Sequence, residues 1–257
     1  MSDGGLQAQR EGDDVFSVRL PTALTGFAPD CVITSASRDW LDVAEGDGGW
    51  RTGEAIQVPD RIFEDSRRVR DELAYRIRTD DVLQSDRGDP ESGGVVLLLE
   101  SPHRDEFDGR GGPAIGPLRN RDVRKTLEKH LPSLIRKAEL SLKRSLVGKP
   151  VILVNAVQYQ ASLQSLMVDY GGSLRSGVRT PVWRAVFDNG GSQDLLTRLD
   201  RYEPALVLLA PTKVVRPAVI RAIRRHDRRW PWLGVNYHPS YWTIRPPRID
   251  GTLQMPR

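Results

Sequence analysis

The stretch VVLLLESPH at residues 95–103 decides the fold, because five apolar residues in a row are followed at once by polar ones. An apolar run without alternation is typical of a strand that is buried on both faces. Further apolar runs occur at residues 150–157, 205–209 and 232–235, and apolar residues have helical spacing near 117–147, 192–201 and 214–225. Strands that alternate with helices in this way indicate an α/β fold. We expect three layers, α/β/α, around a central, mostly parallel four-stranded sheet.

The chain before this stretch has a different character. Residues 1–14 are polar and acidic, and we expect a disordered tail there. We expect residues 15–94 to form an acidic extension packed on the core, and residues 95–257 to form the main domain. Within the extension, the spacing of apolar residues predicts an amphipathic helix over Pro59–Leu83, and the Asp/Gly/Pro/Ser-rich residues 85–94 are the expected linker.

Charge divides the chain at the same place. Residues 1–94 carry 11 basic and 20 acidic side chains, a net of −9, whereas residues 95–257 carry 27 and 14, a net of +13. Arginines account for 32 of the 38 basic residues, and the planar guanidinium matches the oxygens of phosphate groups. The charge therefore favours a polyanionic partner.

Composition also excludes several classes of protein. No apolar run approaches the roughly 20 residues that span a bilayer, and the start of the chain does not resemble a signal peptide. The single cysteine, Cys31, excludes an internal disulfide, a cysteine zinc site and a four-cysteine iron–sulfur cluster. We expect a cytoplasmic monomer that does not contact membranes and uses neither a metal nor another cofactor.

Polar loops follow all four apolar runs, at the strand ends where parallel sheets bind their ligands. The loops are Glu100–Asp108, Asn155–Gln160, Ala210–Lys213 and Asn236–Trp242. Each loop alone is a weak signal, because a polar side chain at a strand end is more often structural than catalytic. Together they predict a site, because the fold brings the four strand ends to one edge of the sheet.

The order of three motifs resembles that of the uracil-DNA glycosylase superfamily. Its thermophilic, iron–sulfur branch reads Gly-Glu-Ala-Pro-Gly, then acidic residues, then a Gly-rich stretch, and this chain has Leu99–His103, three acidic residues and Pro113–Gly116. The superfamily's asparagine at the end of a middle strand corresponds to Asn155, and its His-Pro-Ser motif is intact at residues 238–240. The resemblance covers about residues 95–245 and does not include the iron–sulfur cysteines.

The resemblance implies a monofunctional DNA glycosylase, which hydrolyses the N-glycosidic bond of a flipped-out base and leaves an abasic site. A carboxylate would activate water or stabilise the sugar cation, and a histidine would stabilise the departing base. By resemblance these are Glu100 and His238. Asp105 is the alternative carboxylate, because the position that is Asp or Asn in other branches is Ser101. The base-binding candidates are Asn155, Ser101, His103, Ala114, Ile115 and Gln158.

The same resemblance implies contacts with DNA, either double- or single-stranded. Prolines and a serine would grip the phosphate backbone, and Trp242 stands where a leucine usually wedges into the base stack. The DNA-binding candidates are Pro102, Arg104, Lys213, Pro239, Ser240, Trp242 and Arg245. The arginines between residues 216 and 229 are either a further DNA-binding stripe or a solvated helix face.

Departures from the family favour a substrate larger than uracil. Ala114 stands where an aromatic residue usually stacks on uracil, and His103 replaces a Gly or Tyr of the pocket wall. With the polar residues Arg104, Gln158 and Gln160, this wall is expected to admit a substituent at the 5-position of a pyrimidine. The hypothesis is excision of hydroxymethylated or glucosylated cytosine, as found in some phage genomes, in antiviral defence.

Three other functions stay open from the sequence. The first is a uracil-excising repair enzyme. The second is a catalytically weak nucleic-acid-binding module, in which Ser101 stands in place of the residue that acts as the catalytic base. The third is an enzyme that cleaves a free nucleoside or nucleotide. Substitution of Glu100 and His238 separates an enzyme, which loses function, from a binding module, which keeps it.

Overall fold

The chain forms two compact units in this computed structural model. The structure describes residues 6–11, 15–19, 30–34, 56–58, 65–79, 82–108, 112–161, 183–184, 186–226 and 230–255. Unit 1 comprises Met1–Arg68, Ser101–Ala114 and Val157–Ser192, and unit 2 comprises Val69–Glu100, Ile115–Ala156 and Gln193–Arg257. Each unit is therefore assembled from segments that are far apart in the sequence.

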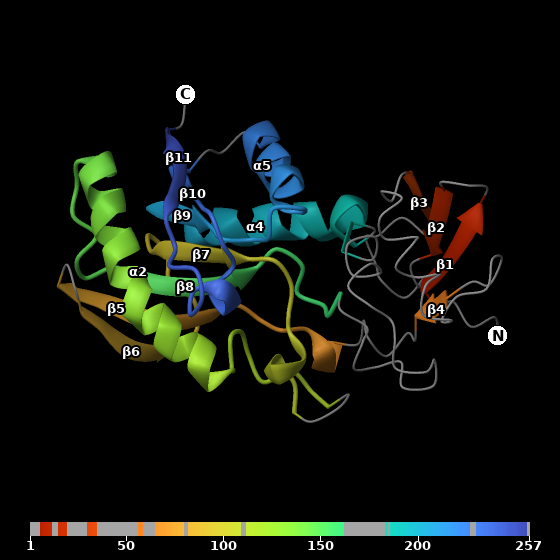
Figure 1. Ribbon diagram of the computed structural model, residues 1–257, viewed down its shortest axis with the longest axis horizontal. Coiled ribbons are helices and arrows are strands. Elements are labelled where there is room, and N and C mark those ends of the chain that lie inside the picture. Colours follow the sequence, from red (N-terminus) through yellow and green to blue (C-terminus); the bar gives the residue numbers. More distant parts are fainter. Residues whose placement is uncertain are drawn as a thin grey trace. The chain divides into compact units, whose positions relative to one another are not determined.

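Unit 2 is built on a seven-stranded mixed sheet, in the order β11-β10-β9-β7-β8-β5-β6 (Figure 1). Its strands are β5 (Glu72–Thr79), β6 (Val82–Gly88), β7 (Val95–Leu99), β8 (Pro150–Asn155), β9 (Leu206–Leu209), β10 (Trp232–Val235) and β11 (Ile249–Gln254). The four predicted strands, β7 to β10, run parallel to one another, whereas β5, β6 and β11 pair antiparallel. The α/β class is confirmed, but the expectation of a mostly parallel four-stranded sheet is wrong, because three antiparallel strands extend it.

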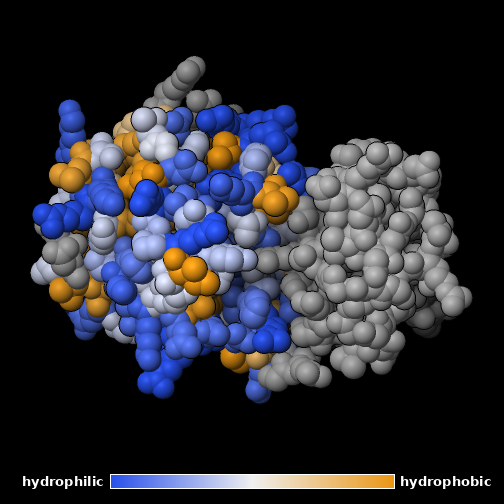
Figure 2. Space-filling view, viewed as in Figure 1, coloured by the Kyte–Doolittle hydropathy of each residue, from blue (hydrophilic) through white to orange (hydrophobic). Residues whose placement is uncertain are grey.

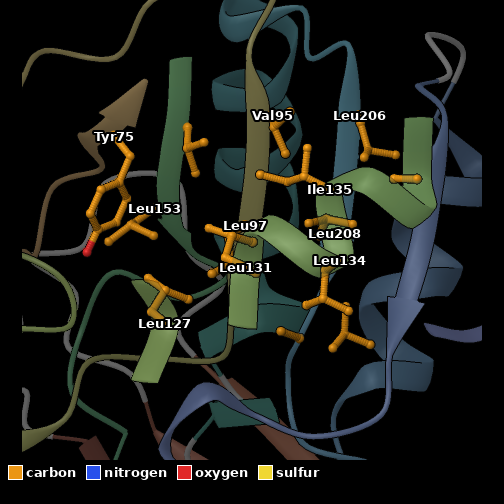
Figure 3. Packing of buried hydrophobic residues seen from close by; sticks show 14 of the residues in the cluster. Tyr75, Val95, Leu97, Leu127, Leu131, Leu134, Ile135, Leu153, Leu206 and Leu208 are labelled. Atoms are coloured by element: carbon orange, nitrogen blue, oxygen red, sulfur yellow. The ribbon is translucent and has the colours of Figure 1, made fainter. Parts of the chain in front are cut away.

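Helix α2 (Arg121–Leu142) covers one face of this sheet. Its Asn120 cap accepts hydrogen bonds from the backbone N–H groups of Asp122 and Val123, at 3.0 and 3.2 Å. Helical spacing places apolar residues on a single side of the helix, which packs on alternate residues of the strands. Figure 3 shows this packing for Leu127, Leu131, Leu134 and Ile135 of α2 against Leu97, Leu153 and Leu208 of the sheet.

Helices α4 (Ser192–Tyr202) and α5 (Arg216–Arg225) complete the helical part of unit 2 (Figure 1). In Figure 3, α4 lies behind the sheet and α2 in front of it. The strand residues that point away from α2, such as Val96, Leu98 and Val154, are fully buried. Burial on both faces explains why these strands have continuous apolar runs instead of an alternating pattern.

The segment before β7 differs from the prediction. The expected helix over Pro59–Leu83 is wrong, because residues 72–79 form β5 and residues 82–88 form β6. Strand β5 pairs with both β6 and β8. The boundary expected between residues 94 and 95 therefore cuts through unit 2. Strand β11, at the other edge of the sheet, was not predicted either.

Unit 1 contains a separate antiparallel sheet in the order β3-β2-β1-β4. Its strands are β1 (Leu6–Glu11), β2 (Val15–Arg19), β3 (Asp30–Thr34) and β4 (Ile56–Val58). Strand β1 lies in the predicted disordered tail, while β2 and β3 lie in the predicted acidic extension. The remaining residues of the tail and of the acidic extension up to Glu64 lie outside the described residues. The unit also contains the short helices η2 (Asp65–Arg67), η3 (Arg104–Glu106) and the π-helix η6 (Phe187–Gly191).

Candidate functional site

The carboxyl ends of β7, β8, β9 and β10 lie along one edge of the sheet in unit 2. In the parallel register, Leu99 is level with Asn155, and Leu98 with Leu209. The backbone N–H of Ala156 donates to Leu99 and that of Ala210 to Leu98, at 3.1 and 2.9 Å. The chain segments that follow these strands consequently start beside one another.

Glu100 is the first residue after β7, and only 2% of its surface is exposed. Its Oε2 atom accepts two hydrogen bonds from Thr212, one from the backbone N–H at 3.2 Å and one from the hydroxyl at 2.5 Å. Thr212 follows β9, so the neighbouring strand end holds this carboxylate. Two donors on one oxygen restrict the rotation of a side chain that otherwise has three flexible torsions.

Asn155 ends β8 and is also buried. Its backbone oxygen accepts a hydrogen bond from Arg198 of α4, at 3.0 Å. The Arg198 guanidinium also binds both oxygens of Asp71, at 2.8 and 2.9 Å, and Asp194 at 2.9 Å, and the Tyr202 hydroxyl donates to Asp71 at 2.8 Å. We call Arg198, Asp71, Asp194 and Tyr202 the Arg198 cluster. It fixes the end of β8 through the hydrogen bond from Arg198 to the backbone of Asn155.

The pKa values in this cluster follow from burial and from its two carboxylates. Burial alone lowers the pKa of the Arg198 guanidinium, but Asp71 and Asp194 outweigh this effect and raise it above its ordinary value. Burial, and then the negative charge of Asp71, raise the pKa of Tyr202 as well. The guanidinium is therefore charged and the phenol neutral at physiological pH.

His238 caps the short helix η7 (Pro239–Tyr241), which follows β10. Its Nδ1 atom lies 3.0 Å from the Ser240 hydroxyl and accepts a hydrogen bond from the Ser240 backbone N–H at 3.4 Å. An Nδ1 atom that accepts from an amide carries no proton, so the proton of the neutral ring is on Nε2.

Trp242 does not occupy the exposed position that a wedge into DNA requires. Its exposed fraction is 0%, its indole N–H donates to the Tyr237 backbone oxygen at 2.8 Å, and its ring meets His130 of α2 edge-on. Trp242 belongs to the core of unit 2, and its burial does not suit the wedge role. Its neighbours Tyr241 and Ile244 are instead exposed, by 54% and 78%.

The other candidates in unit 2 divide by exposure. Lys213, Ser240 and Arg245 are exposed and can meet a ligand, as can Ile115, whereas Pro239 is buried. Most of the coloured surface in Figure 2 is hydrophilic, with small separate apolar spots. The exposed large apolar residues are Val82, Ile115, Leu140, Val147, Val214, Tyr241, Ile244 and Met255.

The loop that continues from Glu100 belongs to unit 1. Ser101 and Pro102 are buried, and the Ser101 hydroxyl has no hydrogen-bond partner in the described part of the chain. His103 and Arg104 are exposed, and both lie against Asp105, at 3.4 and 3.6 Å. Asp105 thus lies beside one guanidinium and one imidazole, and its side chain is 34% exposed.

The remaining base-binding candidates also lie in unit 1. Ala114 pairs with Phe107 in an isolated bridge, and its backbone N–H donates to Ser66 at 2.7 Å. The side chain of Gln158 is buried and accepts a hydrogen bond from Arg68. Within unit 2, Glu100 and Asn155 follow neighbouring strands, and His238 follows β10 at the same edge of the sheet. The candidates Ser101, His103, Ala114 and Gln158 belong to unit 1.

The arginines of the candidate DNA-binding stripe lie in different environments in the structure. Arg216 is buried and donates twice to the Pro211 backbone oxygen, at 3.0 and 3.3 Å. Arg224 stacks over the Trp232 ring, 5.6 Å from its centre. These two arginines support the fold of unit 2, while Arg228 and Arg229 lie outside the described residues.

Two parts of this arrangement were missed from the sequence. Thr212 lies in the predicted loop Ala210–Lys213, where the sequence indicates no role for it, and no sequence pattern marks the Arg198 cluster. Glu100 and Thr212 are 112 residues apart, and Asp71 and Arg198 are 127 residues apart. No local pattern signals such pairs.

No protein-family model matches this chain, and no curated protein matches its sequence. No helix in the described part of the chain is long and apolar enough to cross a membrane. The described residues also contain no group of three or more His, Cys, Asp or Glu side chains suited to a metal ion. Function must therefore be argued from the motifs and from the geometry of the sheet edge.

Proposed function

We propose that this chain is a DNA glycosylase, which flips out a base and hydrolyses its N-glycosidic bond to leave an abasic site. The observation that supports this best is that Glu100, Asn155 and the His238 segment follow β7, β8 and β10 at the same edge of the sheet. These are the carboxylate, amide and imidazole that base excision needs.

Each of the three groups has a part in the reaction. Glu100 orients the attacking water, takes up its proton as the water adds to C1′, and stabilises the positive charge on the sugar. The electrons of the broken bond go to the base, where the Nε2 proton of His238 stabilises the negative charge on the exocyclic O2 oxygen. The amide of Asn155 donates to and accepts from the edge of the flipped base.

DNA is held by the exposed residues beside these groups. Ser240 and Lys213 contact phosphate groups, which fix the register of the protein on the strand. Ile244 and Tyr241 take over the wedge role from Trp242, because they are the exposed apolar residues in the segment after the His-Pro-Ser motif.

The proposed substrate is a bulky modified pyrimidine, such as the hydroxymethylated or glucosylated cytosine of phage DNA, and the proposed role is antiviral defence. The sequence supports it, because Ala114 and His103 stand where the superfamily has a stacking aromatic residue and a Gly or Tyr of the pocket wall. A cytoplasmic location and a monomeric state are part of the same proposal.

The test is an excision assay on matched duplexes that contain uracil, hydroxymethylcytosine, glucosylated hydroxymethylcytosine or plain cytosine at one position. Alkaline cleavage at abasic sites is measured. We expect cleavage of modified cytosine, and a fall of roughly 10²–10⁴-fold for Glu100→Gln. Asp105→Asn is the matched control, since it removes the alternative carboxylate.

Each outcome decides between the candidates. Cleavage of the uracil duplex alone supports a repair enzyme and overturns the modified substrate. Loss of activity in Asp105→Asn but not in Glu100→Gln moves the catalytic role to Asp105. Inertness on all duplexes, combined with DNA binding that Glu100→Gln and His238→Ala leave unchanged, supports the binding module and overturns the glycosylase proposal.

A further inference from the structure

Thr212 holds the carboxylate of Glu100 through two hydrogen bonds. Its backbone N–H and its hydroxyl both donate to the same oxygen, Oε2, at 3.2 and 2.5 Å. A hydroxyl can rotate to donate or to accept, but an ionised carboxylate only accepts, so the Thr212 hydroxyl donates here. A hydrogen bond to an ionised group is stronger than one between neutral groups.

The position of Thr212 is itself fixed by Arg216, at the start of α5. The backbone N–H of Arg216 donates to the Thr212 oxygen at 3.0 Å, and its guanidinium donates twice to the preceding oxygen, that of Pro211. The guanidinium also pairs with Asp250 of β11 at 3.3 Å. The connection between β9 and α5 that carries Thr212 is therefore tied by hydrogen bonds to the start of α5, and through Arg216 to β11.

We propose that Thr212 is a positioning residue, which holds the plane of the Glu100 carboxylate in the orientation needed to direct water at C1′. This inference rests on the proposed glycosylase function. A catalytic group must be kept within about 0.5 Å of its productive position, and a long side chain reaches that accuracy only when other residues restrict its torsions. Thr212 does so without touching the reacting atoms.

The variants Thr212→Val and Thr212→Ser separate positioning from packing. Valine keeps the shape and the backbone N–H but removes the hydroxyl, and serine keeps the hydroxyl. We expect Thr212→Val to lower kcat by about 10- to 100-fold, the effect of losing one hydrogen bond to a charged group, with KM for DNA unchanged. Thr212→Ser is expected to stay within about threefold of the wild type.

The matched control is Thr197→Val in α4. Thr197 is exposed, and its hydroxyl donates to the Gln193 backbone oxygen at 2.9 Å, so this variant also removes one threonine hydrogen bond from unit 2. Its kcat is expected to equal that of the wild type. If Thr212→Val fails to fold, Thr212→Ala takes its place, with Thr197→Ala as its control.

A double-mutant cycle tests the contact without relying on catalysis. Glu100→Ala, Thr212→Val and the double variant are unfolded in urea, and we expect the effects of the two substitutions on the unfolding constant to depart from additivity by at least about threefold. Additive effects would overturn the inference, as would a Thr212→Val protein with wild-type kcat. A wild-type protein that is inert on every duplex overturns the proposed function and this inference together, whereas an active wild type with an unaffected Thr212→Val overturns this inference alone.

Discussion

At the scale of single residues, the Arg198 cluster is the most demanding feature of unit 2. The side chains of Arg198 and Asp71 are 6% and 1% exposed, so both charges have lost their hydration. Such a loss is offset only when the two charges meet each other with good geometry. Arg198 donates to three residues, Asp71, Asp194 and Asn155, the last through its backbone oxygen.

Removal of the buried cation should be strongly destabilising. We expect Arg198→Met to lower the free energy of unfolding by about 3–5 kcal/mol, because Asp71 then keeps its buried charge without its counter-ion. Urea unfolding measures the change. The control is Arg76→Met, which breaks the surface pairs with Asp86 and Glu91 and is expected to have little effect. Equal losses in the two variants would contradict a special role for the buried pair.

Tyr75 gives stability a specific dependence on alkaline pH. Burial, followed by the negative charge of Glu128, raises the pKa of Tyr75 from 10.0 to about 12. Since the folded state favours the neutral phenol, the stabilising contribution is fully present below about pH 10 and is lost as the pH rises from about 10 to 12. Tyr75→Phe should therefore show a flatter fall in unfolding free energy over this range. Tyr202 is unchanged in both proteins, so an identical slope would contradict the assignment to Tyr75.

At the scale of elements, the strands that are buried on both faces were the easiest to predict. Strands β7, β9 and β10 each have an apolar run, and helices α2, α4 and α5 each have apolar residues at helical spacing. The structure has these elements within a few residues of the prediction. Strand β11 was missed because it is an edge strand, largely exposed, and has neither an apolar run nor regular alternation.

Strand β5 shows how a strand can be mistaken for a helix. Leu73 and Ile77 are four residues apart, which fits a helix, and they also lie on one strand that is buried on both faces. Ala74 and Tyr75 between them are buried as well, and the pairing register shifts between Leu73 and Tyr75. A bulge of this kind interrupts the period of two that identifies a strand.

The sequence predicted the positions of Glu100 and Asn155 in the site but not the residues that hold them. Strand ends are visible in the sequence, so the placement of Glu100 and Asn155 at one edge followed from the order of elements. The partners Thr212 and Arg198 depend on which strands are neighbours, and this information is absent from any local pattern.

In the segment after β10, we expect Trp242 to contribute to stability and Ile244 to contact DNA. Trp242→Ala is expected to lower the free energy of unfolding by about 3–5 kcal/mol, because a buried indole leaves a cavity. Ile244→Ala is expected to stay within about 0.5 kcal/mol but to reduce excision from duplex DNA more than from single-stranded DNA, since only a duplex needs the gap filled. Thermal unfolding and the alkaline-cleavage assay measure the two effects. Equal loss on both DNA forms would remove Ile244 from the wedge role.

At the scale of the whole molecule, the sheet of unit 2 includes strands that precede the boundary between the acidic residues 1–94 and the basic residues 95–257. Strands β5 and β6 pair with β8, and Leu73, Tyr75 and Ile77 are buried. A protein that begins at Gly93 therefore lacks two of the seven strands, and we expect it to be insoluble or to unfold without cooperativity. A protein that begins at Asp65 keeps all seven strands and should unfold cooperatively in urea. Cooperative unfolding of the shorter protein would show that β5 and β6 are dispensable.

The same deletion tests what the acidic part of the chain does. Residues 1–64 carry 5 basic and 12 acidic side chains, so a protein that begins at Asp65 has a net charge of +11 in place of +4. If the acidic segment shields the basic remainder, the deletion should tighten binding to duplex DNA of random sequence. The dependence of log K on log salt concentration should also steepen, because each additional phosphate contact adds about 0.9 to the slope. Fluorescence anisotropy between 50 and 200 mM salt, roughly the range in which such contacts are screened, measures both quantities. An unchanged slope would mean that residues 1–64 do not compete with DNA, and that their negative charge serves another partner.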